Sequence, residues 1–125
     1  MRLIKSSIAI FLLGIISCQK PNRTHILSID AQSNFNGEEV IIWIDNREAL
    51  HENLQTELTL GLCVGNGQTK TSAKEGTHEI KVQVGPQTNR TEQFRLTKDL
   101  FIGVNYNKSL DKISFIYSNE RFIYD

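Results

Sequence analysis

Much of the chain alternates between apolar and polar residues with a period of two, which is typical of strands that bury one face. In residues 77–84, for example, Ile80, Val82 and Val84 share one face. Strands of this kind are predicted at 27–31, 58–62, 77–84, 94–96, 102–106 and 113–117. Residues 40–44 are continuously apolar and rich in β-branched side chains, so they predict a central strand.

Turn residues separate these strands at 34–37, 65–67, 74–76, 85–86 and 105–111. Gly65-Asn66-Gly67 contains the Asn-Gly pair that favours a type I′ turn. We therefore expect residues 58–62 and the Thr-rich residues 68–73 to form a hairpin. About seven to nine short strands, with turns between them and no long helical period, predict an all-β fold, an antiparallel β-sandwich.

One segment departs from this pattern of strands. In residues 46–55, Ala49, Leu50 and Leu54 follow one another at near-helical spacing after a capping-type Asp45 or Asn46. We expect a helix of one or two turns there. The last apolar and aromatic residues, at 122–125, predict a short edge strand.

One strand also carries a family resemblance. Residues 76–82 read Gly-Thr-His-Glu-Ile-Lys-Val. This run resembles a strand opening found in many immunoglobulin-like and transthyretin-like bacterial domains. The resemblance agrees with a sandwich fold and implies no functional residues.

The first 17 residues are organised like a secretory signal peptide. Arg2 and Lys5 form a basic head, residues 8–16 form an apolar run, and the small residue Ser17 precedes Cys18. A transmembrane anchor is a poorer interpretation, because it needs about 20 apolar residues and this run has nine.

The residues Ile15-Ile16-Ser17-Cys18 resemble the lipobox of bacterial lipoproteins. In that family the Cys thiol is diacylglycerylated, the signal peptide is cut before the Cys, and the lipid holds the mature protein on a membrane. The resemblance implies lipidation of Cys18 and cleavage between Ser17 and Cys18. An ordinary signal peptide would have small residues at both −3 and −1, whereas Ile15 stands at −3. The implied location is the bacterial cell envelope, on either the periplasmic face of the outer membrane or the cell surface.

The chain thus divides into a signal peptide at 1–17, a lipidated tether at 18–24 and a single β-sandwich domain at 25–125. Once Arg2 and Lys5 are removed with the signal peptide, the 14 acidic residues outnumber the remaining Lys and Arg by two. Nucleic-acid binding depends on a cluster of basic residues, and the sequence contains no such cluster. We therefore expect no nucleic-acid partner.

Candidate chemistry is sparse. The histidines lie in separate segments, at positions 25, 51 and 78, without the local pairing typical of zinc ligands. Cys63 has no disulfide partner if Cys18 is lipidated, and its apolar neighbours predict a buried, unreactive thiol rather than a nucleophile. We predict no catalytic residues, no metal ligands and no cofactor.

Trp43 is the residue whose position bears most on binding. The even-numbered residues of 40–44 are expected to face the core, so Ile41 and Trp43 point outward. Either Leu50 and Leu54 fold back and cover them, or the pair forms an exposed apolar patch. An exposed patch would be a candidate binding surface.

Taken together, these patterns predict a lipid-anchored extracytoplasmic β-sandwich protein, not an enzyme, that acts as a binding or envelope-assembly module. Its ligand would be a protein or a glycan, and its membrane contact would be the lipid on Cys18. The alternative function is that of a periplasmic immunity or inhibitor lipoprotein that blocks a toxin or a hydrolase.

The lipobox makes membrane attachment depend on one sulfur atom. Wild-type protein should incorporate a palmitate analogue during metabolic labelling and partition into detergent, because its acyl chains are buried in the micelle. Cys18→Ser should lose both properties, whereas Cys63→Ser should keep them. Label retained in Cys18→Ser would contradict the lipobox assignment.

Overall fold

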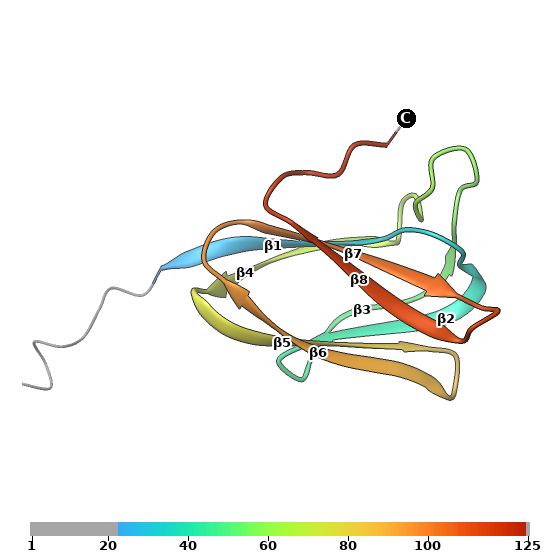
Figure 1. Ribbon diagram of the computed structural model, residues 1–125, viewed down its shortest axis with the longest axis horizontal. Helices are drawn as coiled ribbons and strands as arrows, with labels where there is room; N and C mark the ends of the chain where they lie inside the picture. The colour runs from blue at the N-terminus through green and yellow to red at the C-terminus, as the bar shows by residue number, and fades with distance from the viewer. Residues whose placement is uncertain (1–22, 125) are drawn as a thin grey trace, which may run out of the picture.

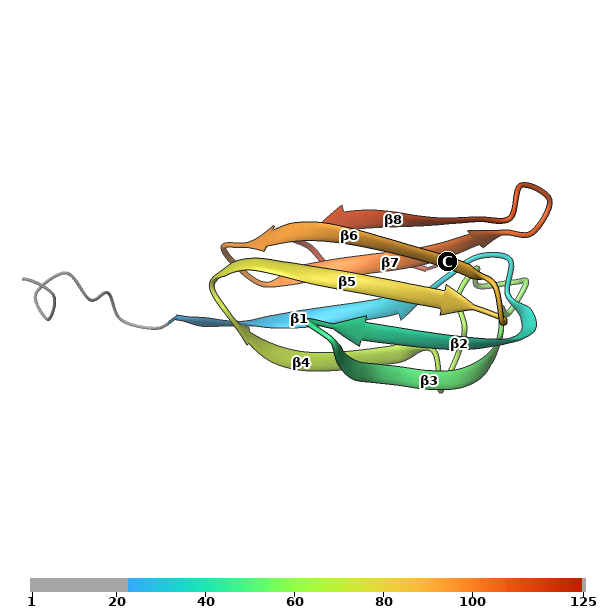
Figure 2. The same cartoon turned by 90° about the horizontal axis from the view of Figure 1, so that it is seen from below.

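The computed structural model describes residues 23–124, which contain eight β-strands and no helix. Figures 1 and 2 show two layers of strands packed face to face. The strands are β1 Thr24–Ala31, β2 Asn36–Ile44, β3 Arg47–Gln55, β4 Gln68–Lys74, β5 Gly76–Val84, β6 Thr88–Leu96, β7 Leu100–Asn107 and β8 Lys112–Ser118. The predicted all-β sandwich is confirmed.

Each layer is a four-stranded sheet. Sheet A has the order β4-β1-β7-β8, and sheet B has the order β3-β2-β5-β6. Neighbouring strands are antiparallel except for β1 and β7, which run parallel. The parallel pair was not predicted, because alternation within a strand carries no information about the direction of its neighbour.

The core lies between the sheets and consists of the apolar faces of the alternating strands. Ile80, Val82 and Val84 of β5 are buried, as are Val40 and Ile42 of β2. Both strands lie in the middle of sheet B, so the predicted central position of residues 40–44 and the predicted inward faces of both strands are confirmed. The core also includes Leu27, Ile29 and Ala31 of β1, Phe94 and Leu96 of β6, Ile102 and Val104 of β7, and Ile113 of β8.

The helix predicted at 46–55 is wrong, because this segment is strand β3. Asp45 and Asn46 have φ angles of 52° and 66° and form a two-residue connection from β2 to β3. Positive φ at both central residues is what a type I′ hairpin turn requires, so these residues begin a hairpin rather than cap a helix. A β-bulge near Ala49 produced the misleading spacing: Ile42 pairs with Leu50 and the next residue of β2 pairs with Glu48.

The strand predicted at 58–62 is also wrong. Residues 56–67 form a long connection from β3 in sheet B to β4 in sheet A, with a single β-bridge between Glu57 and Leu62. Gly65 has a positive φ angle but Asn66 does not, so the predicted type I′ hairpin is absent. The return strand predicted at 68–73 is confirmed as β4.

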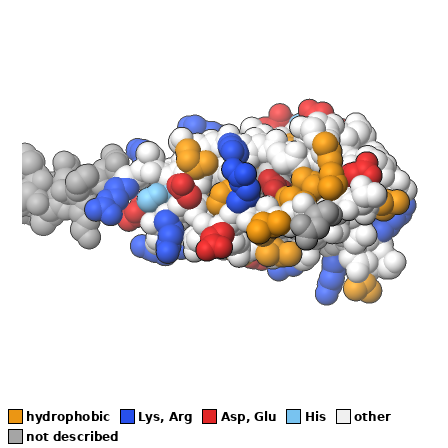
Figure 3. All heavy atoms as spheres, turned by 90° about the horizontal axis from the view of Figure 1, so that it is seen from above, with side chains coloured by type: hydrophobic (Ala, Val, Ile, Leu, Met, Phe, Trp, Pro, Cys, Tyr) orange, Lys and Arg blue, Asp and Glu red, His pale blue; other side chains and the backbone are white. Residues whose placement is uncertain are grey.

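The C-terminal residues form no strand within the described part of the chain, so the predicted edge strand is wrong for residues 122–124. They lie instead over the outer face of sheet A, where the Tyr124 hydroxyl donates to Asp30 Oδ2 at 2.9 Å and accepts from Gln32 Nε2 at 2.8 Å. Figure 3 shows this face of the molecule. A Cβ atom at Gly103 would lie 2.5–2.7 Å from the Gln32 amide group, so a side chain there would displace that group.

Ile80 and Lys81 test the register of β5. Ile80→Ala should lower the free energy of unfolding by about 2–5 kcal/mol, because it leaves a cavity in the core. Lys81→Ala should cost at most about 1 kcal/mol, since Lys81 loses only a half-exposed contact with the Trp43 ring. Urea denaturation of both variants gives the comparison. Equal losses would mean that the register assigned to β5 is wrong.

Candidate functional site

The two ends of the sandwich differ. The described chain begins at Arg23 and enters β1 at one end, here called the tether end (Figure 1). The opposite end, here called the loop end, carries the connections at 32–35, 56–67, 85–87 and 108–111. The predicted lipidation and cleavage residues, Cys18 and Ser17, lie outside the described residues. Across residues 23–124 the structure has no helix that could span a bilayer.

Ile41 and Trp43 are half-buried on the outer face of sheet B. Leu50 and Leu54 belong to the core, on the opposite face, so they do not cover this pair. The Trp43 ring is flanked instead by Lys81, whose Nζ lies 5.2 Å from the ring centroid. The structure thus gives a small, partly shielded patch. Its role as a binding surface stays a prediction.

His51 lies beside this patch, opposite Ile41 in the β2–β3 pair. Its Nε2 is 2.8 Å from Glu39 Oε2, and its Nδ1 is 3.3 Å from Glu48 Oε1. The hydrogen bond to Glu39, together with the charges of both carboxylates, raises the pKa of His51 above 6.5. Two basic side chains therefore flank the patch: His51 lies beside Ile41, and Lys81 lies beside Trp43.

His78 joins two turns at the tether end. Its Nδ1 lies 2.6 Å from Asp45 Oδ2, its Nε2 lies 2.5 Å from the Lys74 carbonyl oxygen, and its ring stacks on Phe94. Both oxygens can only accept, so only the doubly protonated imidazolium donates at both nitrogens. Burial opposes this charge, but Asp45 and the Lys74 carbonyl outweigh it, so the pKa of His78 is raised.

Neither histidine belongs to a metal site in this structure. Among residues 23–124, no group of three or more His, Cys, Asp or Glu side chains is arranged to hold a metal ion. The third histidine, His25, pairs with Glu75 at 2.9 Å.

Cys63 is fully buried and unpaired among the described residues, as predicted. Its Sγ lies 3.6 Å from Thr56 Oγ1. Burial raises the pKa of the Cys63 thiol, which keeps it protonated at neutral pH. A buried thiol of this kind is a poor nucleophile.

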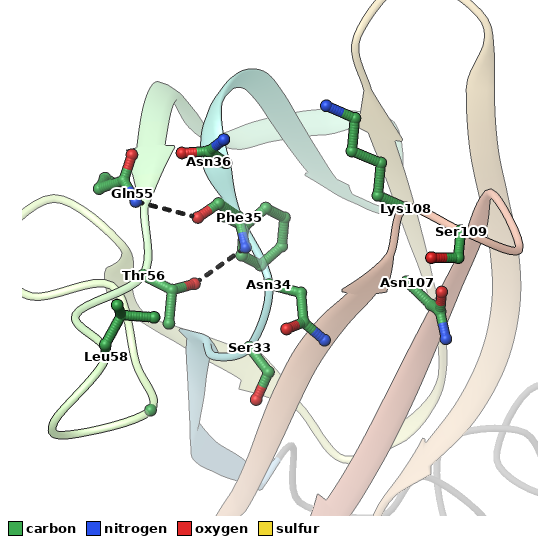
Figure 4. Close-up of a pocket in the computed structure, with 11 residues that line it drawn as sticks. Ser33, Asn34, Phe35, Asn36, Gln55, Thr56, Leu58, Asn107, Lys108 and Ser109 are labelled. Atoms are coloured by element: carbon green, nitrogen blue, oxygen red, sulfur yellow. Dashed lines mark hydrogen bonds between the residues drawn. The ribbon is translucent and has the colours of Figure 1, made fainter.

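The loop end contains an open hollow of about 720 Å³. It lies between the 32–35 connection, the start of the 56–67 connection and the β7–β8 turn. In Figure 4, Asn34 and Phe35 lie on one side, and Asn107, Lys108 and Ser109 lie on the other. Most of the residues that line it carry an amide or hydroxyl group, and Lys108 is the one charged residue among them. The hollow therefore offers many hydrogen-bonding groups and a single positive charge.

Hydrogen bonds hold one wall of the hollow in place. Thr56 Oγ1 accepts from the Phe35 N–H at 2.9 Å and donates to the Gln32 carbonyl at 2.7 Å (Figure 4 shows the first bond). Asn105 Oδ1 accepts from the Ser33 N–H at 3.0 Å. The Phe35 ring is buried and stacks on Tyr106. The main chain at 32–35 is thus fixed before any ligand arrives.

Large apolar side chains project from the connections at this end. Leu58 is 91% exposed and Leu110 is 67% exposed, and Leu60 and Val64 are also exposed. Leu58 borders the hollow on one side, and Lys108 of the β7–β8 turn borders it on the other. The sequence interpretation missed this surface, because alternating leucines looked like one face of a strand. Three glycines within residues 61–67 were the available signal for a loop.

A second concave surface runs along one side of the sandwich, between the edge strands β3 and β4. Small side chains, Ala49 on β3 and Ala73 on β4, line part of it. The other side of the sandwich is closed by larger groups. There Arg90 of β6 donates to the Ile113 carbonyl of β8 at 2.9 Å, and the Tyr117 hydroxyl donates to Glu92 at 2.7 Å.

Comparisons of the chain with protein-family models, with curated proteins and with solved structures gave no match. The case for each candidate surface therefore depends on its geometry alone.

The two histidines with raised pKa values predict how stability depends on pH. The folded protein binds their protons more tightly than the unfolded chain does, so their stabilising contribution is complete below pH 6.5. It is lost as the pH rises through the raised values. Urea denaturation should therefore show a free energy of unfolding that falls as the pH rises above about 6.5.

The double variant His51→Gln, His78→Gln is the control for this prediction. It should be less stable than wild type at pH 6. Above pH 6, its free energy of unfolding should change less with pH than that of wild type. A slope that is the same in wild type and the double variant would contradict the assignment of the titration to these residues.

Proposed function

We propose that this protein is a lipid-anchored binding module of the bacterial envelope, which presents its loop end to another protein. The lipobox resemblance supports attachment through Cys18. The path of the chain supports the orientation, because residue 23 enters the fold at the end opposite the loop end. A membrane at the N-terminus would leave the loop end free to contact a partner.

The observation that carries the proposal is the set of exposed apolar side chains on two loop-end connections, of which Leu58 lines the hollow. Single exposed leucines are common on protein surfaces, but apolar side chains grouped around one concavity are typical of interaction sites. Leu58, Leu60 and Val64 come from one connection and Leu110 from another, and both connections border the same hollow. Nothing in their own fold requires these side chains to be apolar, since they are not in its core.

The chemistry of the hollow favours a protein over a glycan. Sugar sites use an exposed aromatic ring to stack on the apolar face of the sugar. The aromatic side chain in this hollow, Phe35, is 2% exposed. Exposed Leu58 beside amide and hydroxyl groups instead matches the apolar anchors and polar contacts of a protein interface.

Inhibition is a second candidate function of the same surface, and the shape of the 57–62 turn favours it. The Glu57 carbonyl accepts from the N–H groups of Leu60 and Gly61, at 3.2 Å and 2.8 Å, and the Glu57 N–H donates to the Leu62 carbonyl. These bonds close a tight turn with Leu58 projecting from it. A rigid turn with a protruding apolar anchor suits insertion into a cleft of a toxin or hydrolase.

Site-specific photocrosslinking tests the proposal. A benzophenone side chain at Leu58, in the membrane-attached full-length protein in its own cells, should give one discrete adduct of higher mass. The same group at Lys98, in the exposed β6–β7 turn at the tether end, is the control and should give none. Adding Leu110→Ser should lower the yield of the crosslinked adduct at position 58 about tenfold. This change corresponds to about 1.4 kcal/mol of binding free energy.

Two outcomes would refute the proposal. One is the absence of an adduct at Leu58, and the other is the same adducts at Leu58 and Lys98. Circular dichroism on each variant confirms that the sandwich is folded.

A further inference from the structure

We infer that β4 accepts an extended acidic segment of a partner protein as an additional strand of sheet A. This surface lies along the side of the sandwich and is separate from the loop end. The inference rests on the main-chain geometry of β4, on the shape of the groove beside it and on the charges of its side chains.

The main chain of β4 has one free edge. Among residues 23–124 it pairs with β1 alone and forms the edge of sheet A. The Ala31 N–H donates to the Gly67 carbonyl at 2.8 Å, and the Glu75 N–H donates to the Arg23 carbonyl at 2.7 Å, so odd-numbered residues pair through hydrogen bonds at both ends of the ladder. Hydrogen-bonded and non-hydrogen-bonded pairs alternate in an antiparallel ladder. The N–H and C=O groups of Lys70 and Ser72 therefore point away from β1.

The groove beside β4 has room for another strand's side chains. In an added strand, alternate side chains would lie over the space between β3 and β4, a groove of about 680 Å³. Thr69 and Thr71 of β4 face this side, because their β1 partners Ile29 and Leu27 are in the core, and Ala73 follows at the same spacing. Ala49 is the small residue on the β3 side. The β3 side also carries the charged Arg47 and Glu48, so it is the space beside Ala49 and Ala73 that suits small or β-branched side chains from the incoming strand.

The charges of β4 indicate which side chains the incoming strand should place on the outer face of sheet A. Lys70 and Lys74 share the outer face of the strand, and β4 contains no acidic residue. Opposite charges directly across a strand pair are stabilising, and like charges are destabilising. A second copy of β4 is thus a poor partner, because it would bring four lysines onto one face. An incoming strand with Glu or Asp at alternate positions is complementary.

This mode of recognition uses main-chain hydrogen bonds for affinity and alternate side chains for specificity. Lysines on an edge strand are also a common protection against self-association. In β4 the same lysines would select for an acidic strand and against a basic or identical one.

A designed peptide tests the inference directly. The probe is a fluorescein-labelled peptide in which Glu and Val alternate over the length of β4, and the matched control alternates Lys and Val. Fluorescence anisotropy with the detergent-solubilised full-length protein should give a Kd below about 1 mM for the Glu peptide. Affinity should fall with added salt. The Lys peptide should bind at least about tenfold more weakly.

Two variants separate the main-chain and charge contributions. Ser72→Pro removes an N–H that points away from β1, so it should abolish binding, whereas Ser72→Ala keeps that N–H and should bind like wild type. Lys70→Glu combined with Lys74→Glu should reverse the preference between the two peptides. The charge-reversal variant keeps the test decisive if Ser72→Pro does not fold.

The inference is overturned if neither peptide binds at about 1 mM, if both bind equally, or if the charge-reversal variant keeps the wild-type preference. Self-association of the wild type that Ser72→Pro abolishes would also overturn it, in favour of pairing between copies. Leu58→Ser should leave peptide binding unchanged, so failure at β4 and failure of the proposed loop-end function can be told apart.

Discussion

The parallel pairing of β1 with β7 is the constraint on which the sandwich depends. It joins the first strand to the last part of the chain, with Leu27 opposite Leu100 and Ile29 opposite Ile102. Without this pairing, sheet A would fall into two pairs, β4–β1 and β7–β8, and an isolated two-stranded sheet is at best marginally stable in water. Sheet A therefore cannot be completed until β7 has been synthesised and has met β1. Pairing between residues so far apart in sequence is also typical of slow-folding topologies.

The same pairing positions both candidate binding surfaces. Because β1 lies between β7 and β4, it leaves β4 at the edge of sheet A. The connection at 56–67 leads directly into β4 and also forms one side of the hollow at the loop end. The side chain of Asn66 ties this connection to β3 through Glu52 and the Asn53 carbonyl, at 3.4 Å each. A partner at the loop end and an added strand at β4 would thus contact opposite ends of one continuous segment, residues 56–74.

The sequence predicted the fold class and the interior strands because burial imposes a pattern on them. In β1, β2 and β5, one face must be apolar, so alternation or a continuous apolar run identifies them. The pattern failed where something other than burial decided the conformation. A bulge at Ala49 disrupted the alternation of β3, and the alternating leucines 58 and 60 met no neighbouring strand. Alternation shows which residues share a face, but not whether that face is covered.

The candidate site was missed for the same reason. An exposed apolar side chain and a buried one are the same letter in a sequence, and only the topology shows that Leu58 lies on a connection between sheets. The predicted patch at Ile41 and Trp43 was placed on the correct outer face because it followed from the parity of a buried strand. Its partial shielding by Lys81 depends on the β2–β5 register, which the sequence does not encode locally.

The opposed positions of the tether end and the loop end have a mechanical consequence. In a protein held by a lipid at Cys18 and by a partner at the loop end, tension would enter at Thr24 and run along the strands. Force in that direction loads the hydrogen bonds of β1 with β4 and β7 in shear, so that they share the strain and must break together. Pulling across the strands would instead open them one at a time. The arrangement thus resists extension along the strands.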